Sequence, residues 1–170
     1  IINNLRPTVL DLGLHAAIEW QIRDFQRRSG IECTLRMSEE EYPLDDGRAT
    51  ALFRILQESL SNVLRHAQAS RVEADLSIND DTLLMRIADN GVGAFPGCRR
   101  KANSFGLIGI KERVSALGGR LVINTDLNKG MALTIRIPLH GDAVSLASND
   151  EDTDIVFDGM TAYGESVSAD

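Results

Sequence analysis

The sequence predicts an α/β two-layer sandwich, in which three main helices cover one face of a mixed, largely antiparallel sheet. The first observation is the order of the predicted elements: helix, strand, helix, and then two pairs of strands separated by one more helix. The second is that each pair is joined by a short turn, NDD in the first and LNKG in the second, as antiparallel strands commonly are. The sequence contains no internal repeat.

Two helices are predicted in the first seventy residues. The first begins at Pro7 and Thr8 and ends at Gly30, since proline favours a first turn and glycine a helix end. Its apolar residues recur at three- and four-residue steps: Leu10, Leu14, Ala17, Ile18, Ile22 and Phe25. The second helix is capped by Asp45 or Asp46 and runs to about residue 67. We expect its buried stripe to comprise Leu52, Ile55, Leu56, Ser59, Leu60, Val63 and Leu64.

Shorter patterns predict the strands and the third helix. We expect strands at 31–37, 71–78, 82–88, 120–126 and 131–139. Residues 94–105 are polar and basic and contain Pro96 and Gly97, so a mobile loop is predicted there. The third helix is predicted from about Gly106 to Leu117, where two glycines end it.

The composition is typical of a soluble globular protein, with 43% hydrophobic and 25% charged residues in a chain of 170. No apolar run approaches the ~18 residues of a membrane span, and no leader resembles a signal peptide. We therefore expect a cytoplasmic chain, which leaves membrane anchoring of its parent open. Because the chain opens on Ile1, we expect an excised piece of a longer protein. Cys33 and Cys98 lack CxxC spacing, which argues against a disulfide framework or a zinc site.

Charge is unevenly distributed along the chain. Residues 141–170 carry eight carboxylates and no Lys or Arg; since the whole chain has a net charge of −7, the remainder carries +1. This remainder offers no broad basic surface, so nucleic acid is not an expected partner. We divide the chain into a connector with the first helix (1–30), the rest of the domain (31–139) and an acidic tail (140–170). The tail is expected to be flexible, unless IVF at 155–157 docks on the domain.

One polar row stands out in the second helix. Glu58, Asn62 and His66 recur at intervals of four within QESLSNVLRHA, so they share one helical face beside the buried stripe. A solvated face, a metal site and the wall of a nucleotide pocket are all compatible with this row. A carboxylate with an amide oxygen suits Mg²⁺, which keeps several waters and binds substrate phosphates. Zinc requires more His or Cys than this row contains.

Two glycine-containing motifs follow this row. In DNGVG, Asp89 ends a predicted strand, and its carboxylate is able to accept from an exocyclic amine such as that of adenine. Gly91 and Gly93 either form a simple turn or let the backbone approach a flat ligand closely. In SFGLIGIKERV, glycines open a helix, where free N–H groups and the helix dipole favour phosphate. The sequence contains neither a P-loop motif nor a complete dinucleotide fingerprint.

Together these motifs resemble the ATP-binding catalytic domain of sensor histidine kinases, which has the Bergerat fold shared with gyrase, heat-shock chaperone and mismatch-repair ATPases. QESLSNVLRHA resembles the N box, DNGVG the G1 box, FGLIGIKERVSALGG the G2 box, and NKGMALTIRIPL the last glycine-containing hairpin. LRPTVLDLGLHAAIEWQIRDF is similar to the segment that joins the phosphoacceptor helices to this domain in one subfamily. That subfamily pairs with response regulators that have helix-turn-helix output domains. The resemblance covers roughly residues 5–139.

The resemblance implies a role for each motif residue. Asn62 would hold Mg²⁺, Glu58 would act near the γ-phosphate and touch the metal at most indirectly, and His66 or Arg65 would reach a phosphate. Asp89 would bind the adenine amine, and residues 94–105 would form a lid over ATP, with Arg99, Arg100 and Lys101 as candidate contacts. The other nucleotide contacts implied are Gly91, Gly93, Gly106, Leu107, Gly109 and Gly130.

Three features depart from the family pattern. Arg65 replaces a common Lys, and Met131 follows Gly130 where Thr is usual, which puts one polar contact with ATP in doubt. The third is the phosphoacceptor, for which the family uses a histidine followed by an acidic residue. His15, His66 and His140 are the only histidines, and none fits. We therefore expect the acceptor upstream of the first residue.

The resemblance implies a protein histidine kinase whose ATP and Mg²⁺ site lies on this chain. In the intact protein the γ-phosphoryl group would pass to a histidine on the dimerisation domain and then to a response regulator. The intact kinase would be a homodimer, whereas this chain would be a monomer that binds ATP without phosphorylating itself. The alternatives are an anti-sigma-type serine kinase, a nucleotide-binding regulatory module without kinase activity, and a gyrase- or chaperone-like ATPase. The acidic tail is either a linker, an autoinhibitory strand or without function.

Overall fold

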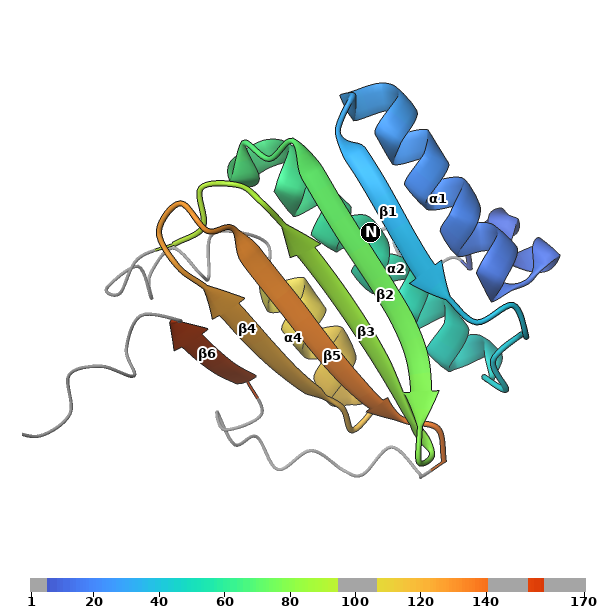
Figure 1. The fold of residues 1–170 in the computed structure, drawn as a ribbon. Helices are drawn as coiled ribbons and strands as arrows, with labels where there is room; N and C mark the ends of the chain where they lie inside the picture. Colours follow the sequence, from blue (N-terminus) through green and yellow to red (C-terminus); the bar gives the residue numbers. More distant parts are fainter. Residues whose placement is uncertain (1–5, 95–106, 141–152, 158–170) are drawn as a thin grey trace, which may run out of the picture.

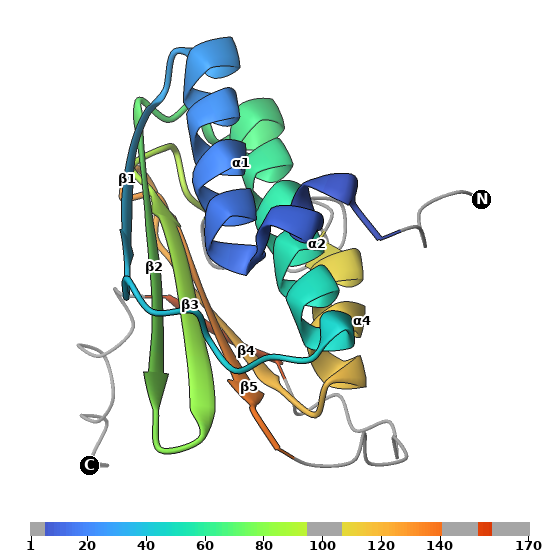
Figure 2. The same ribbon diagram turned by 90° about the vertical axis from the view of Figure 1, so that its right-hand side faces the viewer.

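The computed structural model describes residues 6–94 and 107–140 with their side chains, and residues 153–157 as backbone. Six strands form one mixed sheet in the order β1-β2-β3-β5-β4-β6 (Figure 1). They are β1 (Glu32–Met37), β2 (Arg71–Asn79), β3 (Thr82–Asp89), β4 (Arg120–Thr125), β5 (Met131–Pro138) and β6 (Thr153–Phe157). Helices α1 (Leu14–Ser29), α2 (Asp46–Asn62) and α4 (Leu107–Ala116) lie on one face of this sheet (Figure 2). The predicted two-layer sandwich is confirmed.

The first predicted helix is in fact two helices. A 3-10 turn, η1 (Thr8–Leu12), precedes α1, and Gly13 separates them with φ of +95°. The periodicity hides this break because Leu10 and Leu14 are both buried on either side of it. Gly30, with φ of +72°, ends α1 as predicted.

Asp45 caps α2, since its Oδ1 accepts a hydrogen bond of 2.8 Å from the backbone N–H of Arg48. After Asn62 the helix widens into one π-helical turn, η2 (Val63–Ala67). The predicted stripe is buried up to Val63, but Leu64 is 58% exposed. The prediction for Leu64 is wrong because a π turn closes five residues apart and rotates the side chain out of the α-helical stripe.

The antiparallel centre of the sheet is set by two tight turns. Asp80 and Asp81 have positive φ values of 45° and 58°, the geometry of a two-residue hairpin turn between β2 and β3. β3 then pairs with β5 so that Asp89 lies opposite Met131. This register brings the DNGVG motif against the LNKG turn between β4 and β5. Both outer pairs, β1 with β2 and β4 with β6, are parallel.

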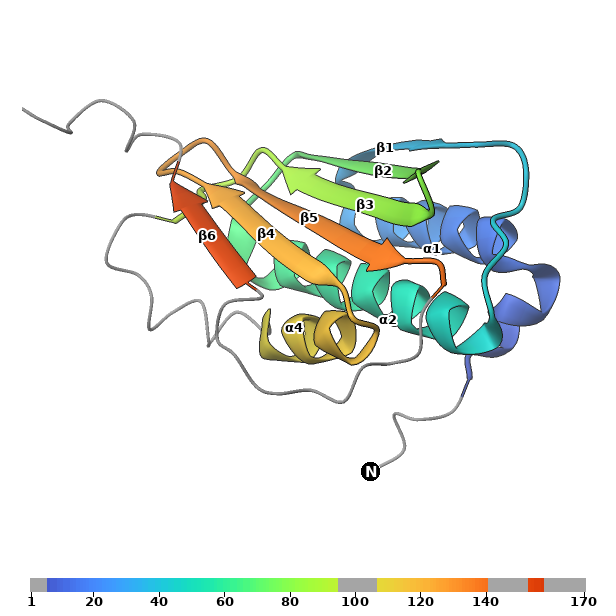
Figure 3. The same cartoon turned by 90° about the horizontal axis from the view of Figure 1, so that it is seen from below.

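Part of the acidic tail forms regular structure. β6 pairs in parallel with β4, and Figure 3 shows it at the sheet edge beside that strand. Residues 153–157, which include the IVF segment, therefore follow the docking alternative that the sequence left open. Tail residues 141–152 and 158–170 lie outside the described residues, as do residues 95–105 of the predicted loop, which include Cys98 and three basic residues.

The hydrophobic core lies between the helices and the sheet. Phe53 from α2 and Ile135 from β5 are fully buried within it, and Ile110 of α4 packs there too. The opposite sheet face is polar, and among the described residues arginines and carboxylates pair across β1, β2 and β3. The core thus lies on the helical face of the sheet, and a cavity opens at one end of this layer.

Candidate functional site

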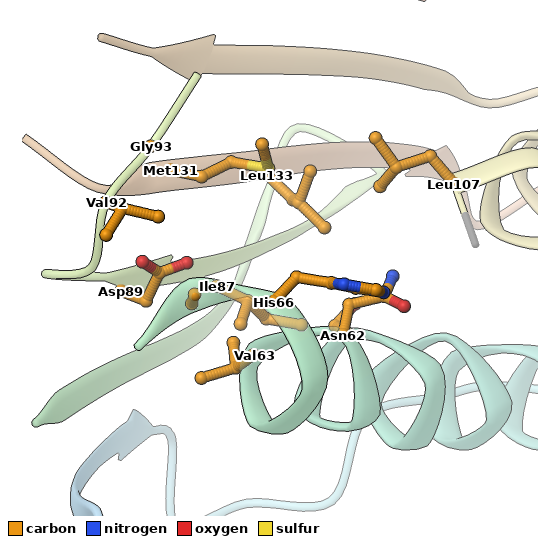
Figure 4. Close-up of a pocket in the computed structure, with 12 residues that line it drawn as sticks. Asn62, Val63, His66, Ile87, Asp89, Val92, Gly93, Leu107, Met131 and Leu133 are labelled. Carbon is orange, nitrogen blue, oxygen red and sulfur yellow. The ribbon is translucent and has the colours of Figure 1, made fainter. Parts of the chain in front are cut away.

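A cavity of about 90 Å³ lies between the end of α2 and the sheet. Figure 4 shows its residues converging from η2, β3, β5 and the start of α4. Its walls are mainly apolar, and the polar groups on it are few. The lining comprises Ser59, Asn62, Val63, His66, Ala67, Ile87, Asp89, Val92, Gly93, Leu107, Met131 and Leu133.

The π turn determines how α2 faces this cavity. Asn62 is the last residue of α2, and His66 lies within η2, so both side chains reach the cavity from one helix end. The amide Nδ2 of Asn62 is buried and has no hydrogen-bond partner among the described residues. A buried amide end without a partner is costly, which marks a place where a ligand or water would bind.

Asp89 supplies the carboxylate of the cavity. Its Oδ1 accepts a hydrogen bond of 2.8 Å from the N–H of Gly91. Burial raises the pKa of Asp89, whereas hydrogen bonds from the backbone N–H groups of Gly91 and Met131 oppose this rise. The carboxylate is thus held by its own turn, yet remains on the cavity wall where it is able to accept from a ligand donor.

The glycines of DNGVG serve close backbone packing. A Cβ on Gly91 would overlap the carbonyl oxygen of Ala67, and the N–H of Val92 donates to this oxygen over 2.8 Å. Gly93 has φ of +59°, and a Cβ there would overlap the carbonyl oxygen of Asp126. Only Gly93 lines the cavity. Gly93 thus lies on the cavity wall, whereas Gly91 lets the backbone at the end of η2 pack against the DNGVG turn.

Gly130 acts from behind Asp89. It has φ of +81°, and a Cβ there would overlap the carbonyl oxygen of Asp89. The carbonyl oxygen of Gly130 accepts from the hydroxyl of Thr125, which in turn accepts from the N–H of Ala94 over 2.9 Å. Thr125 is buried and was not singled out from the sequence. It ties the residue before the undescribed segment 95–106 to the β4–β5 turn.

Glu58 lies beside the cavity rather than in its lining. Arg113 of α4 approaches its Oε2 to 3.4 Å and donates to the carbonyl oxygen of Gly109 over 3.2 Å. A Cβ on Gly109 would lie 2.6 Å from Oε1 of Glu58, so glycine here lets the two helices meet. Arg113 was not predicted from the sequence. The only feature that points to it is its position one helical turn after Gly109.

The structure thus brings together only some of the predicted site residues. Asn62, His66, Asp89, Gly93 and Leu107 share the cavity. Glu58 with Gly109 forms a second contact nearby, and Gly91 with Gly130 supports the walls from outside. Arg65 is exposed and is not part of the lining. Gly106 lies outside the described residues.

Met131, noted as a departure from the family pattern, has two roles in the cavity. Its side chain forms part of the apolar wall, and its N–H donates to the carboxylate of Asp89. The sequence-based interpretation missed the other apolar walls because Ile87 and Leu133 read as ordinary strand residues and Val92 as part of the DNGVG turn. The strand register brings these walls together, because it places β5 next to β3.

The donor set limits what kind of metal the site would hold. The described residues contain no group of three or more His, Cys, Asp or Glu side chains able to hold a metal ion. An ion bound here would therefore rely on the Asn62 amide, on waters and on ligand oxygens, a pattern that fits Mg²⁺. In the described part of the chain no helix is both long and apolar enough to cross a membrane.

Comparison with known proteins places these features in a family. The family model described as "Histidine kinase-, DNA gyrase B-, and HSP90-like ATPase" matches residues 47–141. The oxygen sensor histidine kinase NreB of Staphylococcus carnosus is 32% identical over 136 residues, covering 79% of this chain and 39% of that protein. The histidine-protein kinase/phosphatase DegS of Brevibacillus brevis is 37% identical over 140 residues, covering 82% and 36%. The chain thus spans well under half the length of these relatives.

Solved structures agree on the fold. The blue-light activated histidine kinase of Erythrobacter litoralis superposes with a TM-score of 0.65 at 20% identity, covering 77% of this chain and 44% of that one. The mycobacterial sensor histidine kinase MprB gives a TM-score of 0.57 at 22% identity, covering 74% and 93%. At these identities the likeness bears on the fold alone.

Proposed function

Because this chain belongs to the histidine kinase-, DNA gyrase B- and HSP90-like ATPase family, whose domains use ATP, we propose that its cavity binds Mg-ATP for phosphoryl transfer to histidine. One observation carries the proposal: an apolar cavity has a partly buried carboxylate, Asp89, and an unsatisfied amide, Asn62, on its wall. The relatives named as histidine kinases favour this function over a serine kinase.

The adenine would lie against the strand side of the cavity. Ile87, Met131 and Leu133 give flat apolar contact, and Asp89 accepts from the exocyclic amine. The carboxylate must be ionised to accept fully. The backbone N–H groups of Gly91 and Met131 support that state by opposing the effect of burial on its pKa.

The phosphates would extend toward α4. Leu107 begins this helix, and the N–H groups of a first turn together with the helix dipole favour anions. Asn62 would coordinate Mg²⁺, which neutralises phosphate charge during transfer. Arg113 holds Glu58 at the side of this helix, where the carboxylate would orient groups near the γ-phosphate. We further propose that residues 94–105 cover bound ATP as a lid.

The acceptor histidine would belong to another domain of a longer protein. Both ring nitrogens of His15 are engaged, Nδ1 with Glu41 Oε2 at 3.0 Å and Nε2 with the carbonyl oxygen of Ser38 at 2.9 Å. His66 faces the cavity itself. The proposed assembly is a homodimeric, cytoplasmically exposed kinase that phosphorylates a response regulator. The chain alone would bind ATP as a monomer without phosphorylating itself.

Calorimetric titration with ATP, with and without Mg²⁺, tests the binding site. We expect the chain to bind ATP more tightly with Mg²⁺, and Asp89→Asn to abolish binding. Asp81→Asn is the matched control, because Asp81 lies exposed at the opposite end of β3 and should leave affinity unchanged. Equal affinity in all three proteins would contradict the site. Stoichiometric incorporation of phosphate from labelled ATP into this chain would contradict the proposal that the acceptor histidine belongs to another domain.

A further inference from the structure

His15 is a buried titratable group that the proposed function does not use. It is the second residue of α1 and is 9% exposed. Both of its ring nitrogens contact the loop 38–45, which joins β1 to α2. Nδ1 lies 3.0 Å from Oε2 of Glu41, and Nε2 lies 2.9 Å from the carbonyl oxygen of Ser38. One side chain therefore connects the start of α1 to this loop.

The two partners together indicate the protonation state of the ring. The carbonyl oxygen of Ser38 only accepts, so Nε2 carries a proton. Glu41 has a side chain that is 57% exposed and lies beside the N-terminus of α1, and both conditions favour its ionised form. An ionised carboxylate also only accepts. Both ring nitrogens then have to donate, which only the positively charged imidazolium form of His15 is able to do.

The same carboxylate lies against the hinge between η1 and α1. Gly13 forms this hinge with φ of +95°, and a Cβ on it would lie 2.7 Å from Oε1 of Glu41. One oxygen of Glu41 thus faces the hinge, and the other faces His15. The backbone bonds of the hinge run to both sides, from the N–H of Gly13 to Leu10 and from the N–H of Ala17 to Gly13. Departure of Glu41 would therefore uncover these bonds.

Tyr42 anchors the opposite side of the ring. Its ring centroid lies 4.7 Å from that of His15, close enough for an aromatic ring to stabilise a cation. Its hydroxyl accepts from the N–H of Ser38 over 3.1 Å and donates to the carbonyl oxygen of Leu76 in β2 over 2.7 Å. Ser38 is thus fixed to the sheet, whereas the more exposed Glu41 is able to turn toward solvent.

Other charged groups on the surrounding elements pair with one another or lie exposed. They are Arg6 with Asp11 and Asp46, Arg23 with Glu19, Arg36 with Asp75, Arg48 with Asp45, and the exposed Glu39 and Glu40. Among the described residues, Glu41 is the one charged group in contact with the ring of His15. The charge of the ring is therefore coupled to the position of Glu41.

We propose that His15 and Glu41 form a pH-sensitive lock on the Gly13 hinge, which is closed while the imidazole is charged. When Nδ1 loses its proton, its lone pair faces the carboxylate and the two repel each other. The bond from Nε2 to Ser38 persists, so Glu41 turns away and the hinge loosens. The lock is thus closed in acid and opens as pH rises. The proposed acceptor domain would be attached through η1, and this consequence alone rests on the proposed function.

Hydrogen exchange of the full chain at about pH 5.5 and about pH 8.5 tests the lock. Corrected for intrinsic exchange rates, protection of the Gly13 and Ala17 amides should fall about five- to tenfold at the higher pH. This lies between the values of an exposed ion pair and of a hydrogen bond to a charged group. His140→Gln is the matched control, because His140 is exposed, 3.9 Å from Asp81, and should leave the profile unchanged. Amides of β2 and β3 report whether the fold is intact.

Two substitutions of the exposed Glu41 separate the lock from a general effect of pH. In Glu41→Gln the side-chain amide is able to donate to a neutral ring, so protection should stay high at both pH values; in Glu41→Ala it should be low at both. Nitrogen NMR of the unsubstituted chain should show protons on both ring nitrogens of His15 in acid. A singly protonated ring there, a flat profile in the unsubstituted chain, or an unchanged profile in Glu41→Gln would each overturn the proposal. No nucleotide is present, so this result and that of the ATP titration are independent.

Discussion

Replacing Gly130 by alanine tests whether close packing behind Asp89 holds the cavity wall in place. The added methyl group would overlap the Asp89 carbonyl oxygen, and the residue would keep a φ of +81°. Gly118 is the matched control: its φ is +66°, but the nearest atom to an added Cβ is Pro138 Cγ at 4.0 Å. The two substitutions share the backbone strain and differ in the overlap.

The expected magnitudes follow from these two terms. A left-handed alanine costs about 1–2 kcal/mol, of which lower entropy of the unfolded chain offsets about 0.4–1 kcal/mol. Gly118→Ala should therefore lose about 1 kcal/mol, and Gly130→Ala about 1–3 kcal/mol more because of overpacking. For a chain of this size the second variant should melt about 2–12 °C below the first.

The assays are thermal unfolding and calorimetric titration of ATP into both variants. Since Gly130→Ala displaces the Asp89 backbone, it should weaken ATP binding about 10- to 100-fold, the equivalent of one lost hydrogen bond to a charged group. Gly118→Ala should leave ATP affinity unchanged. Equal stability losses in both variants would refute the argument that this close approach positions the carboxylate.

Three further predictions follow from the structure. Burial raises the pKa of Asp89, so its protonation stabilises the unliganded fold fully below the unfolded-state pKa, and this contribution is lost as pH rises through the folded-state pKa. Asp89→Asn should thus raise stability at neutral pH, and urea unfolding across pH should show the gain vanish in acid. Arg113→Gln should cost under about 1 kcal/mol, because its pair with Glu58 is partly exposed, yet lower kcat more than it raises KM for ATP in the parent kinase. Leu60→Ala should cost about 2–5 kcal/mol in urea unfolding, whereas Leu64→Ala should stay within about 0.5 kcal/mol; similar losses would contradict the π turn.

Local patterns were sufficient for most of the fold. Hydrophobic periodicity, caps and turn residues are read within a few positions, and they located α2, the β2–β3 hairpin and the strand pair around LNKG. They failed where geometry departs from the regular period. Gly13 interrupts a stripe that looks continuous, and the π turn removes Leu64 from a stripe that an α-helix would extend. Composition alone likewise left the docking of residues 155–157 undecided, since the pairing of β6 depends on the edge of β4.

The candidate site was less predictable because its contacts join distant segments. The motifs located Asn62 and Asp89, whose side-chain chemistry is legible in isolation. The close approach of Gly91 to the backbone of Ala67, 24 positions earlier, could not be predicted from the motif alone. Arg113 carried no signal of its own, because its partner Glu58 lies 55 positions earlier in the chain. Such pairings are fixed by the way α2 and α4 pack, which no local pattern encodes.

Asp89 shows why stability and function oppose each other at this site. Burial penalises the ionised carboxylate, and the two backbone donors from Gly91 and Met131 offset only part of that penalty, since the pKa remains raised. A neutral Asn would remove the penalty and keep the shape, so stability alone does not explain the acid. What Asn cannot supply is a full negative charge for a ligand donor. Asp89→Asn should therefore stabilise the unliganded chain while abolishing ATP binding. If the variant were instead less stable and also failed to bind ATP, the carboxylate would serve the fold.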